Sequence, residues 1–169
     1  MEDPRIDFGL KNKRSINTDA DILKNIQIAL ENYDVLIFNQ QVTGSITNQD
    51  FINETNKLFE KFINKIVVLD SRHYNASFQN VYRKTNEIEI AVLNGLDVKP
   101  QDYISISDVQ KHGIRVYEQY KKPIFITCGS RGVVTIDSTG ISEVQGVQLL
   151  KRLDTVGAGD TTISALTLC

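Results

Sequence analysis

The sequence predicts an α/β fold in which helices cover both faces of a mostly parallel β-sheet. Short, continuously apolar segments such as DVLIFN (34–39) and KIVVLD (65–70) alternate along the chain with longer amphipathic segments. Strands that are apolar throughout are typical of parallel sheets buried on both faces. The chain of 169 residues, 41% of them hydrophobic and 24% charged, is long enough for a domain with a core of its own. We therefore expect one domain over residues 1–169.

Two helix–strand units are expected in the first half of the chain. Residues 18–33 place apolar side chains at helical spacing, with Thr18 as the N-cap, and the strand 34–39 follows directly. A second amphipathic helix is expected over about 48–64, before the apolar strand 65–70, which ends in an acid.

The middle of the chain continues this alternation. A short strand is expected at 81–85, followed by the helix NEIEIAVLN, which Gly95 ends. A further helix is expected over 105–121, weakened at its centre by Gly113.

The last third of the chain adds an antiparallel element. The apolar segments 123–129 and 132–137 are so close in sequence that they predict two strands joined by a tight, glycine-flanked turn. The apolar segment 147–153 follows, then the loop DTVGAGD and a C-terminal helix. Together these elements indicate a three-layer, Rossmann-like α/β sandwich with a small antiparallel part.

Ligands of such sheets bind beyond the carboxyl ends of the parallel strands. We expect five parts of the chain to meet there: Asn39, Asp70, the segment 84–89, Gly129 and the loop 154–160.

Charge and composition exclude several classes of function. The net charge of −2 gives no basic footprint for nucleic acid or for an anionic membrane. No apolar run is long enough to span a bilayer, and the N-terminus lacks the apolar core of a signal peptide. Cys128 and Cys169 match no metal spacing, and two reduced thiols fit a cytoplasmic protein.

The loop DTVGAGDTT (154–162) is the strongest functional signal. Its glycines allow close backbone approach, and at a helix start the N–H groups of Gly157, Ala158 and Gly159 would form an anion hole. An acid beside an anion hole suits a base that accepts a proton from an attacking hydroxyl, which is the role we predict for Asp160. The plain alternative is an aspartate in the first turn of a helix, stabilised by the helix dipole.

This loop resembles the C-terminal signature of the PfkB/ribokinase family of carbohydrate kinases, D-T-x-G-A-G-D. Two more motifs follow the family's order: TNEIE (85–89) is similar to its N-x-x-E motif, and ITCGSRGVV (126–134) resembles its T-x-G-x-x-G turn. The segment RIDFG (5–9) and its spacing to VLIFNQQVTGSIT look most similar to the heptose-phosphate kinase branch.

The resemblance implies an ATP-dependent carbohydrate kinase that uses Mg²⁺. Asp160 would be the catalytic base, and Asn86 and Glu89 would act through magnesium and water. Thr127, Gly129 and Gly132 would lie near the nucleotide, and Asp154 is a candidate for a monovalent cation site that would hold K⁺.

Several of the candidate residues have a purely structural alternative. Glu89 can be a solvated helix residue, Asn86 a helix N-cap, and Gly129 and Gly132 hairpin-turn residues. Asp70 can be a strand-end acid bonded to nearby amides.

The segment NQQVTGSIT (39–47) departs from the heptose-kinase branch, which usually carries an aspartate–tyrosine pair and then a lysine before the glycine. This chain has Gln40, Gln41 and Thr43 there, and none of them supplies the positive charge of a lysine. Three other basic residues are candidates to replace it: Arg72, Arg83 and Lys84.

The resemblance covers the C-terminal part of the family's domain, so we expect a chain truncated at both ends relative to the family. The acceptor would be a hydroxyl of a sugar or sugar phosphate, and a homodimer is a candidate assembly. The alternative function is a nucleotide- or phosphosugar-binding protein without catalysis.

Overall fold

The computed structural model describes residues 13–41, 47–147 and 157–168. Within these residues the strands form one six-stranded sheet in the order β1-β2-β3-β4-β5-β6. The first four strands run parallel and the last two are antiparallel. Their bounds are β1 Val35–Gln40, β2 Ile66–Ser71, β3 Tyr82–Asn86, β4 Ile124–Thr127, β5 Gly132–Asp137 and β6 Gly140–Gln145. The predicted α/β class, with its mostly parallel sheet and small antiparallel part, is confirmed.

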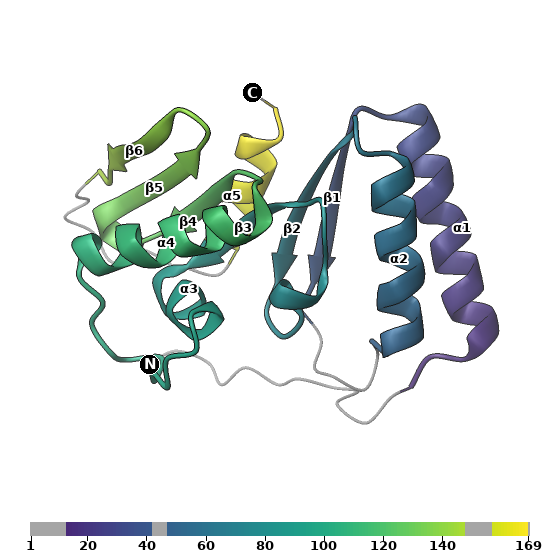
Figure 1. Cartoon of the computed structure of the whole chain (residues 1–169), viewed down its shortest axis with the longest axis horizontal. Helices are drawn as coiled ribbons and strands as arrows, with labels where there is room; N and C mark the ends of the chain where they lie inside the picture. Colours follow the sequence, from purple (N-terminus) through teal and green to yellow (C-terminus); the bar gives the residue numbers. More distant parts are fainter. Residues whose placement is uncertain (1–12, 42–46, 148–156, 169) are drawn as a thin grey trace.

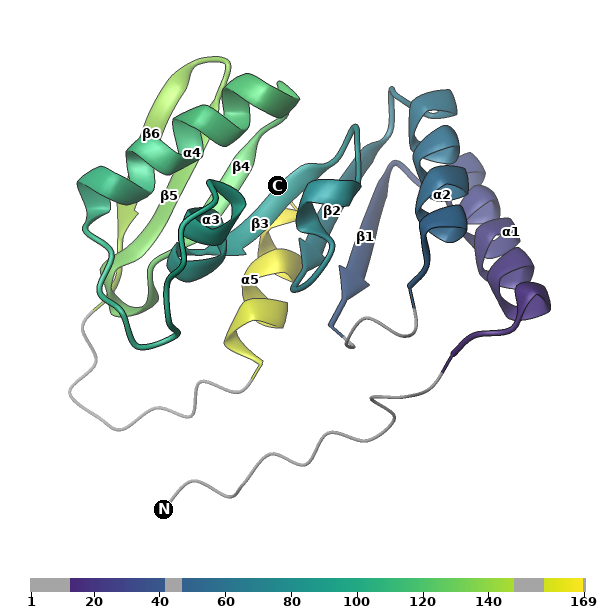
Figure 2. The ribbon, with the colours of Figure 1, turned by 60° about the horizontal axis from the view of Figure 1, so that its bottom comes forward.

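Four helices cover one face of the sheet and a fifth lies on the other (Figures 1 and 2). The first four pack into two buried clusters with the side chains of β2, β4 and β5 that point to their side. The helices are α1 Ile16–Asn32, α2 Gln49–Lys61, α3 Glu87–Leu93, α4 Ile106–Tyr120 and, on the opposite face, α5 Ala158–Leu166. A sheet with helices on both faces was predicted and is confirmed.

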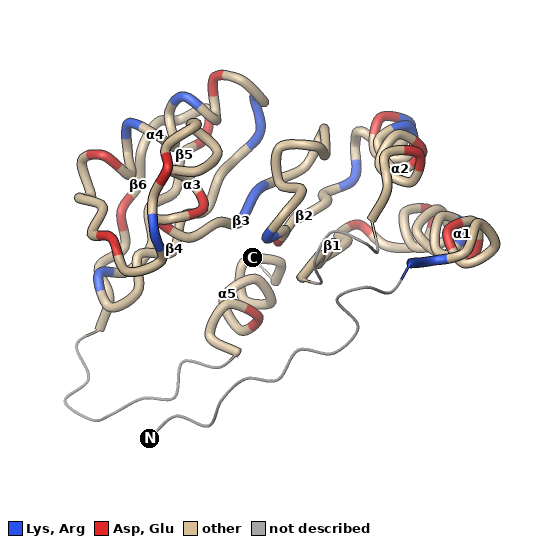
Figure 3. The backbone as a smooth tube through the Cα atoms, turned by 90° about the horizontal axis from the view of Figure 1, so that it is seen from below, with Lys and Arg blue, Asp and Glu red and all other residues tan. Residues whose placement is uncertain are grey.

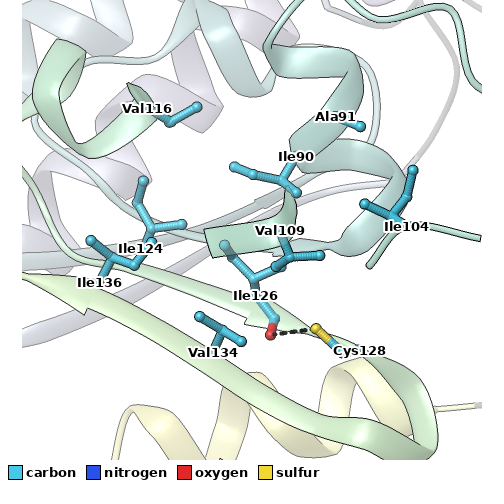
Figure 4. Close-up of a cluster of buried hydrophobic side chains, with 10 residues drawn as sticks. All are labelled: Ile90, Ala91, Ile104, Val109, Val116, Ile124, Ile126, Cys128, Val134 and Ile136. Atoms are coloured by element: carbon cyan, nitrogen blue, oxygen red, sulfur yellow. Dashed lines mark hydrogen bonds between the residues drawn. The ribbon is translucent and has the colours of Figure 1, made fainter. Parts of the chain in front are cut away.

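Each half of the sheet has its own core under these helices. The first half, under α1 and α2, contains an aromatic group in which the Phe38 ring lies edge-on to Phe59 and Phe78, with centroids 5.6 and 5.0 Å away. The second half, under α3 and α4, is mostly aliphatic (Figure 4).

Gly113 brings α4 close to the sheet. A Cβ atom at this position would lie 2.3 Å from the Cδ1 atom of Ile136 and 2.8 Å from that of Ile126. The helix is continuous through this glycine, so its role is close packing against β4 and β5.

Two of the sequence predictions need correction. Ser15, and not Thr18, is the N-cap of α1, because its Oγ accepts a hydrogen bond from the Thr18 backbone N–H at 3.1 Å. The strand β6 was not predicted. All six of its residues are exposed, so the apolar pattern that revealed the other strands is absent from it.

In the described residues no helix has the length and apolar character needed to cross a membrane. The predicted segment 147–153, apart from Val147, and Cys169 lie outside the described residues. Cys128 is a buried free thiol whose pKa is raised, chiefly by burial.

Candidate active site

The carboxyl ends of the parallel strands bring three polar side chains into one row. Asn39 of β1 is in register with Asp70 of β2, and Asp70 is in register with Lys84 of β3. Side chains alternate between the two faces of a strand. The neighbouring residues Leu69 and Arg83 are also in register with each other, and Leu69 belongs to the core under α1 and α2. Asn39, Asp70 and Lys84 therefore lie on the opposite face, the one that carries α5.

Lys84 and Asp70 form a buried ion pair in this row. The Lys84 Nζ donates to Asp70 Oδ2 at 2.9 Å, and the two residues are only 7% and 4% exposed. Asp70 is thus paired with a lysine, where the sequence alternative was bonding to nearby amides. A buried ion pair of this kind is costly to break, because the remaining partner would be left charged without compensation.

The start of α5 packs directly over this lysine. Gly157 is the N-cap and has a φ of +79°, a left-handed conformation that favours glycine. At Gly159 a Cβ atom would lie 3.0 Å from the Lys84 Nζ. One glycine is therefore needed for the turn and the other for the close approach of the helix to the ammonium group.

The N-terminus of α5 has the features of an anion site. Gly157 has no side chain to cap the first-turn amides of α5. Among the three residues of the predicted anion hole, Ala158 and Gly159 lie in that first turn, and Gly159 approaches the Lys84 ammonium. Backbone amides, the positive end of a helix dipole and a cation together favour a phosphate.

Asp160 lies in the first turn of α5 and is exposed. The Asn39 Nδ2 is 3.5 Å from its Oδ1, so the carboxylate stands beside the end of β1. The structure thus brings Asp160, Gly159, Lys84 and Asp70 together at one edge of the sheet. The role of Asp160 as catalytic base stays a prediction.

Asn86 and Glu89 form a capping box at the start of α3. The Asn86 Oδ1 accepts from the backbone N–H groups of Ile88 and Glu89, and Glu89 Oε2 accepts from the Asn86 N–H at 2.8 Å. Asn86 is therefore an N-cap, as its structural alternative proposed. Glu89 is half-buried and is not a solvated helix residue.

The pKa of Glu89 is raised above its ordinary value, chiefly because the carboxyl is buried. The bond from the Asn86 N–H and the charges of Lys84 and Arg72 act in the opposite direction but do not outweigh the burial. Within the described residues no group of three or more His, Cys, Asp or Glu side chains is arranged to hold a metal ion. A single glutamate that interacts electrostatically with Lys84 would fit Mg²⁺ held mainly by water and substrate phosphates, which is how this ion is commonly bound.

The three residues predicted to lie near the nucleotide are at the carboxyl end of β4. Thr127 is in register with Asn86, and its Oγ1 donates to the Thr85 carbonyl at 3.2 Å. Gly129 and Gly132 have φ values of +57° and +101°. A Cβ at Gly132 would lie 2.0 Å from the Val144 carbonyl oxygen of β6, so the pairing of β5 with β6 itself requires a glycine here. Their contacts with a nucleotide stay predictions.

Of the three basic candidates, the structure removes one from the site. The Arg83 guanidinium lies 3.5 Å from the centroid of the Tyr120 ring, on the face covered by α1–α4, and it donates to the Phe78 and Val81 carbonyls. Lys84 is the residue whose importance sequence reasoning underrated. The signal that could have found it is strand alternation, which places neighbours in a strand on opposite faces. Asp154 and Thr43 lie outside the described residues.

The fold is that of an α/β protein with a candidate anion site at the carboxyl ends of its parallel strands. The model of the pfkB family carbohydrate kinases matches residues 82–169, which is about half of the chain. The chain belongs to the pfkB family of carbohydrate kinases. No curated protein matches it by sequence.

Solved structures of this fold are similar over most of the chain. A mutant of phosphofructokinase-2 from Escherichia coli is 18% identical with a TM-score of 0.73, covering 92% of this chain and 50% of its own. The same enzyme in complex with potassium is 18% identical with a TM-score of 0.68, covering 88% and 48%. Ribokinase from Arabidopsis thaliana, complexed with ribose and ATP, is 16% identical with a TM-score of 0.63, covering 83% and 44%. The chain thus spans about half the length of these proteins, and the ribokinase-like fold is confirmed.

Proposed function

We propose that this chain carries the phosphoryl-transfer site of an ATP-dependent carbohydrate kinase. The observation that carries the proposal is the approach of Gly159 to the Lys84 ammonium, which joins the start of α5 to a buried cation. The family match supports the same activity. The unit is a single kinase domain over residues 1–169 that corresponds to about half the length of the similar structures.

In the proposed reaction the oxygen of an acceptor hydroxyl attacks the γ-phosphorus of ATP, and the bond from that phosphorus to the β–γ bridging oxygen breaks. Asp160 accepts the hydroxyl proton, and ADP leaves with the bridging oxygen. The amides of Gly157, Ala158 and Gly159, with Lys84, stabilise the charge on the transferred group. Mg²⁺ bound near Glu89 would neutralise the β- and γ-phosphate oxygens.

The remaining assignments also belong to this proposal. Asn86, Thr127, Gly129 and Gly132 line the nucleotide side, and Asp154 contributes to a K⁺ site, which the potassium complex of a similar structure supports. The acceptor is a sugar or sugar phosphate, as in the similar structures with ribose and with fructose-6-phosphate. A homodimer and a cytoplasmic location complete the proposal.

The test is Asp160→Asn, measured by turnover on a panel of sugars and sugar phosphates and by calorimetric titration of Mg·ATP. We expect turnover to fall by about 10²–10⁴-fold, the usual effect of a general base, with nearly unchanged Mg·ATP affinity. The matched control is Asp50→Asn, because Asp50 also lies exposed in the first turn of a helix.

Two results would contradict the assignment. If Asp160→Asn retained turnover and changed only stability, as Asp50→Asn does, Asp160 would be a dipole-stabilising residue. If the chain bound Mg·ATP but transferred phosphate to no acceptor, the alternative of a non-catalytic nucleotide-binding protein would be favoured.

A further inference from the structure

Four charged side chains form a stripe along the exposed surface of α2, called the charge stripe below. They are Asp50, Glu54, Lys57 and Lys61. Because an α-helix turns once in about 3.6 residues, the spacing of these positions keeps them on one side of the helix. The buried residues of α2 lie on its other side and pack into the core. The charge stripe is therefore not what attaches α2 to the sheet.

The charges of the stripe are divided by sign along the helix. Both acids lie in the N-terminal half of α2 and both lysines in its C-terminal half. A two-fold axis that passes between positions 55 and 56 exchanges position 50 with 61 and position 54 with 57, so it exchanges each acid with a lysine. Two copies of α2 packed antiparallel about this axis would therefore bring every charge of the stripe opposite a charge of the other sign.

The centre of the stripe already holds an ion pair. The Lys57 Nζ lies 2.6 Å from Glu54 Oε1, and the two side chains remain 70% and 52% exposed, so both can still meet a partner. The two-fold axis would place two of these pairs side by side in opposite orientation, as a closed network of alternating charges. A single exposed ion pair contributes little to binding, but a network of several charges contributes more.

In the described residues, neither end of the stripe has an ion-pair partner within the chain, since no ion pair there involves Asp50 or Lys61. The lysine end borders a hollow between α1 and α2. Three lysines and two leucines contribute to its lining: Lys24, Lys57, Lys61, Leu23 and Leu58. A basic hollow with some apolar surface fits the acidic end of a helix, and the acidic end of α2 itself has this chemistry.

The charge stripe lies away from the candidate active site. The helix α2 covers the face of the sheet opposite the one that carries α5 (Figures 1 and 2). Both acidic and basic positions are visible on α2 when the molecule is seen from below (Figure 3). Association through α2 therefore does not involve the face that carries α5, and turnover should not depend on it.

We propose that the charge stripe of α2 is a dimerisation surface that binds a second copy of this chain in antiparallel orientation. Asp50 and Glu54 of each copy pair with Lys61 and Lys57 of the partner subunit. The proposal specifies the surface of the homodimer named above, and it does not depend on the kinase function, because no residue of the stripe belongs to the candidate site. Charge holds most of this dimer together, so its affinity depends on salt.

The experiment measures the mass of the chain by sedimentation equilibrium. We expect a monomer–dimer equilibrium whose dissociation constant rises about tenfold or more between about 0.1 M and about 1 M NaCl, because the screening length falls from about 10 to about 3 Å. Asp50→Lys with Glu54→Lys makes the stripe wholly basic, and Lys57→Glu with Lys61→Glu makes it wholly acidic. Each double variant alone should be monomeric. An equimolar mixture of the two should dimerise, because every charge again faces one of the other sign.

The matched control is Lys111→Glu with Arg115→Glu, which makes the charge change of the acidic variant on exposed residues of α4 and should dimerise as the unsubstituted chain does. A chain that is monomeric at every concentration would overturn the proposal. Dimers that persist in both variants or ignore salt would do so too, because they would use another surface. So would variants that stay folded by circular dichroism but remain monomeric when mixed.

A milder pair of substitutions covers the case in which a charge reversal unfolds the chain. Lys57→Ala with Lys61→Ala keeps good helix-forming residues at both positions and removes half of the charge stripe. We expect this variant to raise the dimer dissociation constant about threefold or more in about 0.1 M NaCl. An unchanged dissociation constant would show that the lysines of the stripe do not hold the dimer, and the proposal would be wrong.

Discussion

Arg83 and Lys84 are neighbours in β3, both basic and both buried, yet the two faces of the sheet use them differently. On the face covered by α1–α4, Arg83 is fully buried, stacks on Tyr120 and donates to backbone carbonyls. On the face that carries α5, Lys84 pairs with Asp70 and lies under Gly159.

The two cations differ in whether they can still interact with a ligand. Arg83 is committed to the fold, and desolvation by burial lowers its pKa to about 10. Lys84 is held by one carboxylate and still meets the glycine of α5 where a ligand anion would bind. Because neighbouring side chains of a strand point to opposite faces, Arg83 stabilises the core while Lys84 faces the candidate site. Substitutions on each face should affect stability and ligand binding in different proportions.

The largest effect is expected from Lys84→Met. It leaves Asp70 buried and unpaired, which should cost about 3–5 kcal/mol of unfolding free energy. Loss of one stabilising charge should also lower turnover by about 10²–10³-fold. Urea unfolding and steady-state kinetics measure the two effects.

The double substitution Lys84→Met with Asp70→Leu separates them. Replacing a buried pair by apolar residues is often neutral for stability, so unfolding free energy should largely recover while turnover does not. Recovery of turnover in the double variant would show that Lys84 has no part in the chemistry.

Tyr120→Leu should have a smaller effect, and on stability alone. It removes the ring over Arg83 and the hydrogen bond from the Tyr120 hydroxyl to the Ala76 carbonyl, 3.0 Å long. We expect a loss of about 2–3 kcal/mol, and of only about 1 kcal/mol for Tyr120→Phe, which keeps the ring. Calorimetric titration should give the same Mg·ATP affinity for all three proteins. A weaker Mg·ATP affinity in Tyr120→Leu would mean that the two faces are coupled.

Much of the fold could be predicted from the sequence because its signal is local. The parallel strands β1, β2 and β4 begin with an apolar run, and the amphipathic helices repeat apolar residues at helical spacing. The strand β6 lacked that signal, because all its residues are exposed and its place at the edge of the sheet depends on pairing with β5. The cap of α1 was misplaced because Ser15 and Thr18 are both preferred capping residues, and residue type alone does not say where the helix begins.

The site could be predicted in its parts but not in its assembly. The glycines and Asp160 were visible as a motif, and the structure places them where the strand ends meet. The ion pair between Lys84 and Asp70 depends on the register of β2 against β3, which no local pattern contains. The same holds for Arg72, whose place is set by pairing of β1 with β2.

The smallest effect is expected from Glu89→Gln, and its sign depends on pH. The raised pKa of Glu89 means that the folded protein holds this proton more tightly than the unfolded chain does. Between the ordinary pKa of 4.5 and the raised value, the folded state therefore binds more protons, and stability falls as pH rises. A glutamine at position 89 can keep the capping box, since its side-chain oxygen can also accept from the Asn86 N–H.

The stability of Glu89→Gln relative to the unsubstituted chain should therefore increase as pH rises through this window and stay constant above it. Urea unfolding at a series of pH values measures the difference, with Glu118→Gln, an exposed glutamate of α4, as the control for the amide itself. A constant difference in stability across all pH values would mean that burial does not raise the pKa of the Glu89 carboxyl. At neutral pH the same variant should need more Mg²⁺ for ATP binding although its fold is no less stable. That combination would identify Glu89 as a group whose charge serves ligand binding and lowers the stability of the fold.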